Sequence, residues 1–370
     1  MKKFVSRGLA CVLVAVQALS AANAADEPAS APTGSALGDI FSASGITATG
    51  YVAASYSVSN GYPFNIHQFD INHNSFQLDQ AGLTIAYQPE EGFGAVVDVI
   101  AGEDARLVHL AEDGNDDTVD IKQAFVQYVT GGLTVMAGKY VTLAGAEVIS
   151  PALNANYSRS LLFFANQPLT HTGIRASYAL TDAFTVTAGV NNGWNTTSTS
   201  YGSKTAEVGI GWIPNTTFSL TAQGYFGKSE IYDAERDLVD IVATYNATSA
   251  LTFVLNFDYN KQEFVGGSDA TWTGVAAYVN YAINDQWRVS VRYEYEDDKD
   301  GFLTGAEQHL QEGTLTFGFS PVKSFELRLE GRYDTAGSVD TFYKTSSAIL
   351  AGIPDTDSLS QFAIQGVFKF

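Results

Sequence analysis

The sequence predicts an all-β protein, a transmembrane antiparallel up-and-down β-barrel of about sixteen strands. Three observations predict it. Apolar and polar residues alternate over segments of about ten residues. Tight turns and long loops connect these segments in alternation up to the last residue, Phe370. The N-terminus is typical of an exported protein. Fourteen or eighteen strands stay open, because the early segments alternate less regularly.

The alternation is clearest in the second half of the chain. In 287–296 and 325–334 the odd positions, apart from Gly331, are apolar or aromatic and the even ones are polar, and 251–260 repeats the pattern with one exception. A period of two residues indicates a strand with one apolar and one wet face. About ten residues suffice for a tilted strand to cross an apolar band of about 25 Å, with aromatic residues at both interfaces. These segments therefore fit a bilayer.

The whole chain after the leader divides in this way. The expected strands are 46–58, 73–87, 93–102, 119–129, 132–142, 169–180, 183–193, 205–213, 216–228, 237–247, 250–262, 271–282, 286–296, 310–319, 323–334 and 358–370. An even number places both termini in the periplasm. The alternation changes phase once within 76–87, which predicts a β-bulge. No run of helical spacing is expected between the strands, and the long connections, among them 103–118 and 335–357, are expected to be loops outside the cell.

The first 45 residues are expected to lie outside the barrel. Lys2, Lys3 and Arg7 precede an apolar run that is too short to span a membrane, and Ala22 and Ala24 are small enough for signal-peptidase cleavage. Residues 1–24 are therefore predicted to be a signal peptide, 25–45 a flexible periplasmic leader and 46–370 the barrel. The single cysteine, Cys11, falls in the signal peptide, so that no disulfide is expected in the mature chain.

Composition argues against several classes of function. The chain has 40 acidic and 20 basic residues, a net charge of −20, and nucleic acid requires the opposite balance. His67, His73 and His109 lack the paired spacing of metal ligands. We expect no catalytic residues, no cofactor and no metal.

Charged residues at the polar positions are expected to face an aqueous lumen, since an arginine on the lipid face at mid-depth costs about 2–4 kcal/mol. The candidates for lining the pore and setting its selectivity are Arg175, Arg288, Arg292, Glu294, Arg328 and Arg332. Sixteen strands enclose a water-filled rather than a packed interior. Whether these charges select solutes or are paired charges that only hydrate the pore stays open at this point.

The segment 140–168 is the longest connection, and a connection of that length is usually functional or disordered. Its apolar residues 161–164 would be unfavourable in free solvent. We therefore expect the segment to fold inward and narrow the pore, with Glu147 and Arg159 in the solute path. The alternative is an apolar plug that packs against the rim.

Three blocks of residues carry a resemblance to a known family. Residues 154–160 (NANYSRS), 168–173 (PLTHTG) and 191–194 (NNGW) resemble the central block of the OmpL-like putative β-barrel porin family, and 92–94, 102–105, 138–140 and 145–147 are similar to its earlier half. The resemblance covers roughly 46–370 and implies an outer-membrane channel. It implies no catalytic residue.

The sequence thus predicts a porin of the cell outer membrane for passive diffusion of small polar or charged solutes. The expected partners are outer-membrane lipid, lipopolysaccharide, and the barrel-assembly machinery through the terminal Phe370. A homotrimer is left open. The alternatives are a structural or surface-adhesion barrel and a barrel hydrolase, for which Ser158 or Ser160 with His171 and Glu147 is the only set that can be assembled.

Overall fold

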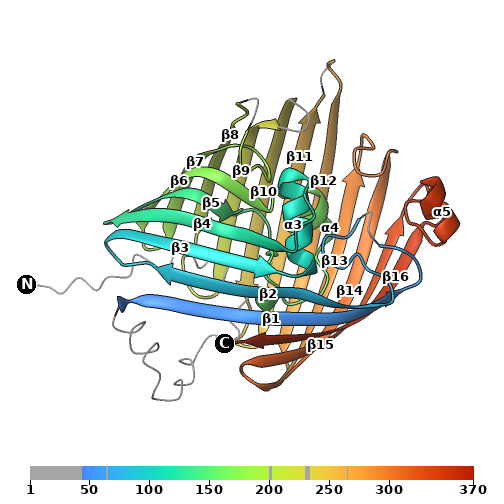
Figure 1. The fold of residues 1–370 in the computed structure, drawn as a ribbon, viewed down its shortest axis with the longest axis horizontal. Coiled ribbons are helices and arrows are strands. Elements are labelled where there is room, and N and C mark those ends of the chain that lie inside the picture. Colours follow the sequence, from blue (N-terminus) through green and yellow to red (C-terminus); the bar gives the residue numbers. More distant parts are fainter. Residues whose placement is uncertain (1–43, 64–65, 200–201, 230–233, 265) are drawn as a thin grey trace, which may run out of the picture.

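A computed structural model describes residues 44–63, 66–199, 202–229, 234–264 and 266–370 (Figure 1). The expected signal peptide, 1–24, lies outside the described residues, as does the leader except for its last two residues. The described chain forms a closed antiparallel barrel in which every strand pairs with its neighbours in sequence and β1 pairs with β16.

The barrel has sixteen strands within the described residues, which confirms the expected fold and strand number. Their bounds are β1 (Ile46–Ser59), β2 (Ser75–Tyr87), β3 (Gly92–Ala101), β4 (Val119–Thr130), β5 (Leu133–Val141), β6 (Thr170–Thr181), β7 (Phe184–Asn191), β8 (Thr205–Trp212), β9 (Phe218–Ser229), β10 (Ala234–Asn246), β11 (Leu251–Glu263), β12 (Asp269–Ala282), β13 (Trp287–Asp298), β14 (Gln308–Val322), β15 (Phe325–Ala336) and β16 (Ser358–Lys369).

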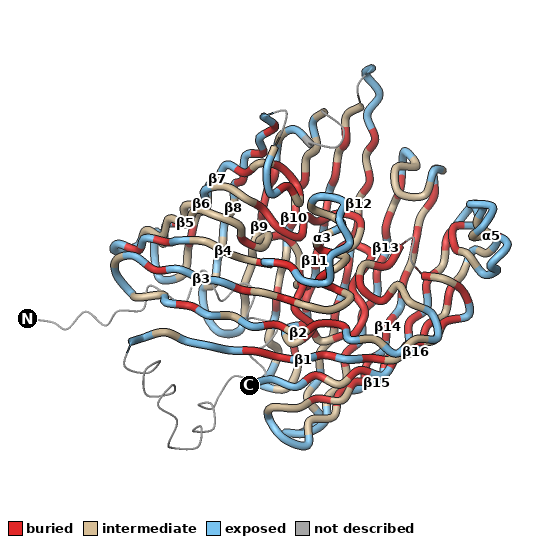
Figure 2. The backbone as a smooth tube through the Cα atoms, in the orientation of Figure 1, coloured by how far each residue is buried: buried red, intermediate tan, exposed pale blue. Residues whose placement is uncertain are grey.

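The alternation in sequence becomes an inner and an outer face (Figure 2). On β13, Val291 and Tyr293 point outward and are 42% and 52% exposed, whereas Arg292 and Glu294 point inward and are fully buried. Outward apolar side chains are exposed because lipid, their natural solvent, surrounds the barrel. The stacked rings of Trp287 and Phe319 lie on this face at the short-turn end, as expected for a membrane interface.

The first and last strands close the barrel along nine residue pairs, from Tyr51↔Lys369 to Ser59↔Gln361. The terminal residue continues this pairing, because Phe370 exchanges backbone hydrogen bonds of 2.8 and 2.9 Å with Gly50. A Cβ atom at Gly50 would lie only 2.5 Å from the Phe370 ring, so a glycine is required there for the ring to lie across β1.

The expected bulge is confirmed on β2. Ala53 and Ala54 of β1 pair with Gln80 and Leu78, which leaves Asp79 as the extra residue. The turn expected between the strands 310–319 and 323–334 is displaced. β14 continues to Val322, and its register with β15 shifts between Phe319 and Val322. A proline in that stretch, Pro321, is tolerated because a bulge needs no ladder hydrogen bond from it.

The expectation of no helix was wrong. Residues 103–113 form α3 (Glu103–Asp113), and two shorter helices are α4 (Leu161–Ala165) and α5 (Ser346–Ala351). In α3 only Ala105 and Val108 are buried apolar residues, so the helical period in the sequence is short and weak. Its ends do carry signals, two acidic residues in the first turn and Gly114 in the left-handed conformation at the C-cap. None of the helices in the described ranges has the length and apolarity to cross a membrane.

Candidate pore and its inner segment

Residues 142–169, which we call the inner segment, connect β5 to β6 and run through the inside of the barrel. They include a 3₁₀ turn, η1 (Pro151–Leu153), which contacts β16 and β1, and α4, which contacts β12 and β13. The hydroxyl of Ser160 caps α4 by accepting a hydrogen bond from the Phe163 amide at 2.9 Å. Leu161, Leu162 and Phe163 are buried in three separate apolar clusters.

A glycine and a polar pair on the barrel wall allow α4 to pack closely against β12. A Cβ atom at Gly274 of β12 would lie 2.7 Å from Leu162 Cδ1 and 2.1 Å from Glu296 Oε2. Glycine therefore lets α4 approach the strand. The Asn166 side chain at the end of α4 donates to Glu296 at 3.0 Å and accepts from the Trp272 ring nitrogen at 2.7 Å.

Charged residues on the inner face of β13–β15 hold the backbone of the inner segment. We call them the charged wall: Arg292, Glu294, Glu296, Glu312, Arg328, Glu330, Arg332 and Asp334. The Glu330 carboxylate accepts hydrogen bonds from the amides of Tyr157 at 2.7 Å and Ser158 at 2.9 Å. Arg292 donates to the Ser158 carbonyl at 3.0 Å and forms an ion pair of 2.8 Å with Glu147.

The remaining charged-wall candidates act in the same way. Arg332 donates to the Arg159 carbonyl at 2.6 Å, Arg328 donates to the Pro151 carbonyl at 2.9 Å, and Glu294 accepts from the Leu162 amide at 3.2 Å. All three side chains are at most 3% exposed. The structure thus brings Arg292, Glu294, Arg328 and Arg332 together, but under the inner segment rather than along an open pore.

The sequence predicts that Arg159 faces the solute path, but the structure buries it within the inner segment. Arg159 is 1% exposed, and its guanidinium donates to three carbonyls of its own segment, those of Val148, Ile149 and Tyr157, at 2.8–2.9 Å. Phe69 and Phe163 lie 5.3 and 5.9 Å from it. Arg159 therefore holds the two arms of the inner segment together.

Two arginine candidates lie outside the charged wall. Arg175 of β6 forms a 2.8 Å ion pair with Glu207 and stacks over the Tyr140 ring at 4.2 Å, and both charged groups are buried. Arg288, near the short-turn end of β13, pairs with Glu326 at 2.6 Å, and its side chain is 18% exposed. Arg288 is thus the most accessible of the candidates.

A histidine in the connection between β1 and β2 extends this network. His67 contacts Asp70 at 2.6 Å and Asp334 of the charged wall at 3.2 Å, and it is buried. Burial and the nearby Arg332 lower the pKa of His67, but the carboxylates of Asp70 and Asp334 outweigh them, so the pKa lies above its usual value. The charged His67 in turn holds the pKa of Asp70 below its usual value, against the effect of burial.

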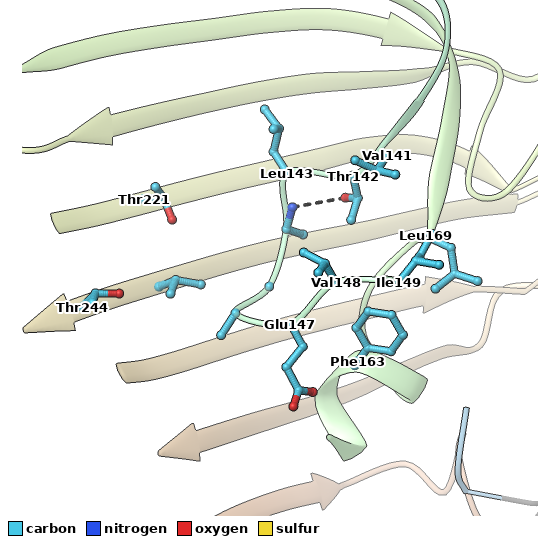
Figure 3. A pocket seen from close by; sticks show the side chains of 14 residues that line it. Val141, Thr142, Leu143, Glu147, Val148, Ile149, Phe163, Leu169, Thr221 and Thr244 are labelled. Carbon is cyan, nitrogen blue, oxygen red and sulfur yellow. Dashed lines mark hydrogen bonds between the residues drawn. The ribbon is translucent and has the colours of Figure 1, made fainter. Parts of the chain in front are cut away.

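A cavity of about 30 Å³ lies between the first arm of the inner segment and β9–β10 (Figure 3). Its lining combines residues 141–149 with Phe163, Leu169, Thr221, Val242 and Thr244. Glu147 points away from Thr221 and Thr244 in Figure 3. Its carboxylate forms the 2.8 Å ion pair with Arg292. Among the described residues, no group of three or more His, Cys, Asp and Glu side chains is arranged to hold a metal ion.

Sequence reasoning did not identify the anchoring roles of Glu330 and Asn166. It also missed Glu312, which forms a 2.9 Å ion pair with Arg292. Asn156 was also missed, although its side chain donates to Thr316 of β14 at 2.6 Å. One signal was available: acids and bases alternate along the inner positions of β15, and β13 carries both kinds of charge, a pattern that favours pairing within the wall.

The comparisons with known proteins agree with this geometry. A family model described as "Putative beta-barrel porin-2, OmpL-like" matches residues 45–370. The chain belongs to this family. The resemblance found in the sequence is thereby confirmed, and the protein is a porin of the outer membrane.

Solved structures share the fold of this porin at low sequence identity. An anion-selective porin from Comamonas acidovorans gives a TM-score of 0.63 at 12% identity and covers 88% of this chain and 99% of its own. The outer-membrane channel DcaP of Acinetobacter baumannii gives 0.60 at 14% identity, with 88% and 97% covered. OmpT of Vibrio cholerae, in a trimer form, gives 0.60 at 12% identity, with 88% and 99% covered. The sequence matches no curated protein.

Proposed function

We propose that this porin is a diffusion channel for small solutes whose bore is narrowed by the inner segment. The observation that carries the proposal is the anchoring of that segment: Glu330 and Arg292 bind its backbone from the far wall. A segment held by charge-assisted hydrogen bonds inside a barrel keeps a fixed position, so that the narrowest passage keeps a fixed shape.

Single-channel recording tests this proposal. Refolded protein in a planar bilayer should give discrete, small conductance steps. Deletion of residues 156–164, which removes the backbone groups that Glu330 binds, should give larger steps. Differing gel mobility of boiled and unboiled samples shows that each form has closed into a barrel. A folded wild type that does not conduct, or a folded deletion variant with unchanged conductance, contradicts the proposal.

We infer transport rather than hydrolysis, because the groups of the hydrolase alternative are engaged elsewhere. Ser158 Oγ accepts a hydrogen bond from Arg292 at 2.9 Å, and Ser160 Oγ caps α4. His171 stacks on Tyr225 with ring centroids 4.6 Å apart, and its Nδ1 lies 3.2 Å from the Gly193 carbonyl. A catalytic set would require these groups to converge on one another.

We also propose that the porin assembles as a homotrimer and that Phe370 presents its terminal strand to the barrel-assembly machinery. The trimer form of the V. cholerae OmpT structure supports the first point. The position of Phe370 supports the second, since it directly follows β16 and is 66% exposed. Outer-membrane lipid and lipopolysaccharide remain the proposed surroundings. Light scattering in detergent tests the trimer, and the yield of inserted Phe370→Ala protein in cells tests the recognition of Phe370.

A further inference from the structure

The strands carry very little charge at the short-turn end of the barrel. In the four residues of each strand nearest that end, the strands that the structure describes have charged side chains at only four positions, all on β13, β15 and β16: Arg288, Glu326, Arg328 and Lys369. All four point inward, since each pairs across the sheet with an inward residue. We call these four residues the mouth cluster. It combines three cations with one carboxylate, although the chain as a whole has a net charge of −20.

A single carboxylate holds two of the three cations. Glu326 accepts a hydrogen bond from Arg288 Nε at 2.6 Å and one from Arg328 Nε at 2.7 Å. A glycine of β14 makes room for the first of these contacts. A Cβ atom at Gly318 would lie 2.6 Å from Glu326 Oε1 and 2.8 Å from Arg288 Nε. The two arginines therefore share one negative charge and keep a fixed position.

The third cation has no partner. Lys369, at the end of β16, lies opposite Tyr51 of β1 and is exposed. The charged groups that act on it are Glu326, Arg328 and Arg288. Among the described residues, the Lys369 ammonium forms neither a hydrogen bond nor an ion pair. Its charge is therefore available to a solute at this end of the lumen.

Arg288 also keeps a free donor group. Its Nε donates to Glu326 and its Nη1 donates to Ser290 Oγ at 2.8 Å, whereas its Nη2 has no hydrogen-bond partner in the part of the chain that the structure describes. The side chain of Arg288 is 18% exposed. Arg328, by contrast, is 2% exposed and donates to the Pro151 carbonyl. Arg328 thus adds charge to the mouth cluster, while Arg288 and Lys369 offer accessible donors.

Other carboxylates have less effect at this end of the lumen. Those of the charged wall are at most 2% exposed beneath the inner segment. The short turns carry four more carboxylates, all of them exposed: Glu90, Glu91, Asp182 and Asp285. Salt screens such exposed charges beyond about 8 Å, and none of the four is among the groups that act on Lys369. The accessible charge on the inner face at this end is therefore positive.

We propose that the mouth cluster is a binding site for small oxyanions, solutes that carry a carboxylate or a phosphate group, and that Arg288 and Lys369 contact them. The inference rests on the proposed function and names its solute class. A guanidinium and an ammonium with free donors bind carboxylate and phosphate oxygens through charge-assisted hydrogen bonds. Low-dielectric walls focus the field of a charged site, so that a net positive site in an uncharged aqueous passage raises the local concentration of anions.

The first test measures ion preference. In a KCl gradient across a planar bilayer, the reversal potential of the wild type should have the sign of preferred chloride permeation. Lys369→Gln should shift it towards cations, and Glu326→Gln, which removes a charge of opposite sign, should shift it towards anions. Lys344→Gln removes an exposed cation from the connection between β15 and β16, and this control should leave the reversal potential unchanged. Differing gel mobility of boiled and unboiled samples shows that each variant has closed into a barrel.

The second test measures binding. Inorganic phosphate and, in a separate series, acetate are added to the KCl-filled channel at constant ionic strength. At least one of the two anions should lower the chloride current with saturation. Its half-saturating concentration should rise at least about tenfold in Arg288→Gln, which corresponds to about 1.4 kcal/mol of binding free energy. The anion with the lower half-saturating concentration identifies the preferred group.

The two tests separate this inference from the proposed function. A conducting wild type that prefers cations overturns the inference and leaves the proposed channel intact. The same holds if folded Lys369→Gln and Glu326→Gln do not shift in opposite directions, or if neither phosphate nor acetate gives saturable block. A folded wild type that does not conduct overturns the proposed function itself.

Discussion

The inner face of the barrel has two walls of opposite character. On β13 and β15 most inward positions carry a charge, β14 between them contributes Glu312, and Arg292 and Glu294 are fully buried beneath the inner segment. On β6–β9, towards the short-turn end, the inward positions carry small uncharged residues: Ser177, Thr185, Thr187, Gly209, Gly211 and Thr221. The hydroxyls of Ser177 and Thr187 form a hydrogen bond of 2.9 Å with each other. Within the described residues, neither side chain forms a hydrogen bond with the inner segment.

The contrast shows that charge inside a barrel need not be charge inside a pore. The charged wall binds peptide groups of the inner segment, as Glu330 does with two consecutive amides. Buried charges are tolerated only when they are paired and hydrogen-bonded, and the inner segment supplies those partners. Under the proposed function, we therefore expect the uncharged wall to be the one that faces the solute.

The largest expected effect follows from breaking the charged wall at its centre. Arg292→Met leaves Glu147, Glu294 and Glu312 without their shared cation, and removal of one partner of a buried ion pair costs about 3–5 kcal/mol. Urea unfolding in detergent, followed by tryptophan fluorescence, measures this loss. Arg288→Met is the matched control, since its pair with Glu326 is partly exposed and is worth about 1 kcal/mol or less. Equal losses in both variants would mean that the inner segment does not bury the wall.

A smaller effect is expected where a single carboxylate holds the inner segment. Glu330→Gln keeps the shape but loses the charge that Tyr157 and Ser158 donate to, which costs about 1–3 kcal/mol. Hydrogen exchange of these two amides should accelerate, and the open-channel current should become noisier. Thr187→Val on the uncharged wall should change neither quantity. Unchanged exchange at Tyr157 and Ser158 in the Glu330 variant would contradict this anchoring.

The third expected effect depends on pH through His67. Its pKa is raised in the folded state, so protonated His67 contributes stability that is fully present below its unfolded pKa of about 6.5. That contribution is lost as pH rises through the folded pKa. The unfolding midpoint should therefore fall more steeply above about pH 6.5 in the wild type than in His67→Gln. Parallel pH profiles of the two proteins would rule out this link between the β1–β2 connection and Asp334.

The smallest expected effect concerns the accessibility of the two walls to water, with stability nearly unchanged. Thr187 on the uncharged wall is partly exposed, whereas Thr316 of β14 is fully buried under Asn156. The only native cysteine is Cys11. Thr187→Cys should therefore react with a small charged thiol reagent much faster than Thr316→Cys. Equal rates would mean that water reaches both walls alike.

The fold could be predicted because membrane strands must repeat one simple pattern. Val289, Val291 and Leu329 had to face lipid once their neighbours were charged, and this fixed the two faces of β13 and β15. Helix α3 was missed because its contacts with Phe69, Ile149 and Phe163 come from distant parts of the chain. Those contacts, and not a strong period of its own, bury its short apolar face.

The site could be predicted only in part, for a similar reason. The sequence indicated that residues 161–164 need burial and that Arg292 and Arg332 point inward. It did not show that Arg159 would bind the carbonyls of Val148, Ile149 and Tyr157. Such contacts depend on the irregular path of the inner segment, and no periodic pattern encodes that path.

The pairing of β1 with β16 has a consequence for how the porin reaches its membrane. Asn60 and Ser360, which bond at 2.9 Å, are 300 residues apart along the chain. Contacts of such long range form slowly, because closing the intervening chain costs entropy before any contact compensates for it. Until they form, both strands present unpaired amides and carbonyls that lipid cannot satisfy. Closure at Gly50 and Phe370 therefore has to accompany insertion, and a chain that is shortened at either strand would remain an open sheet, prone to aggregation.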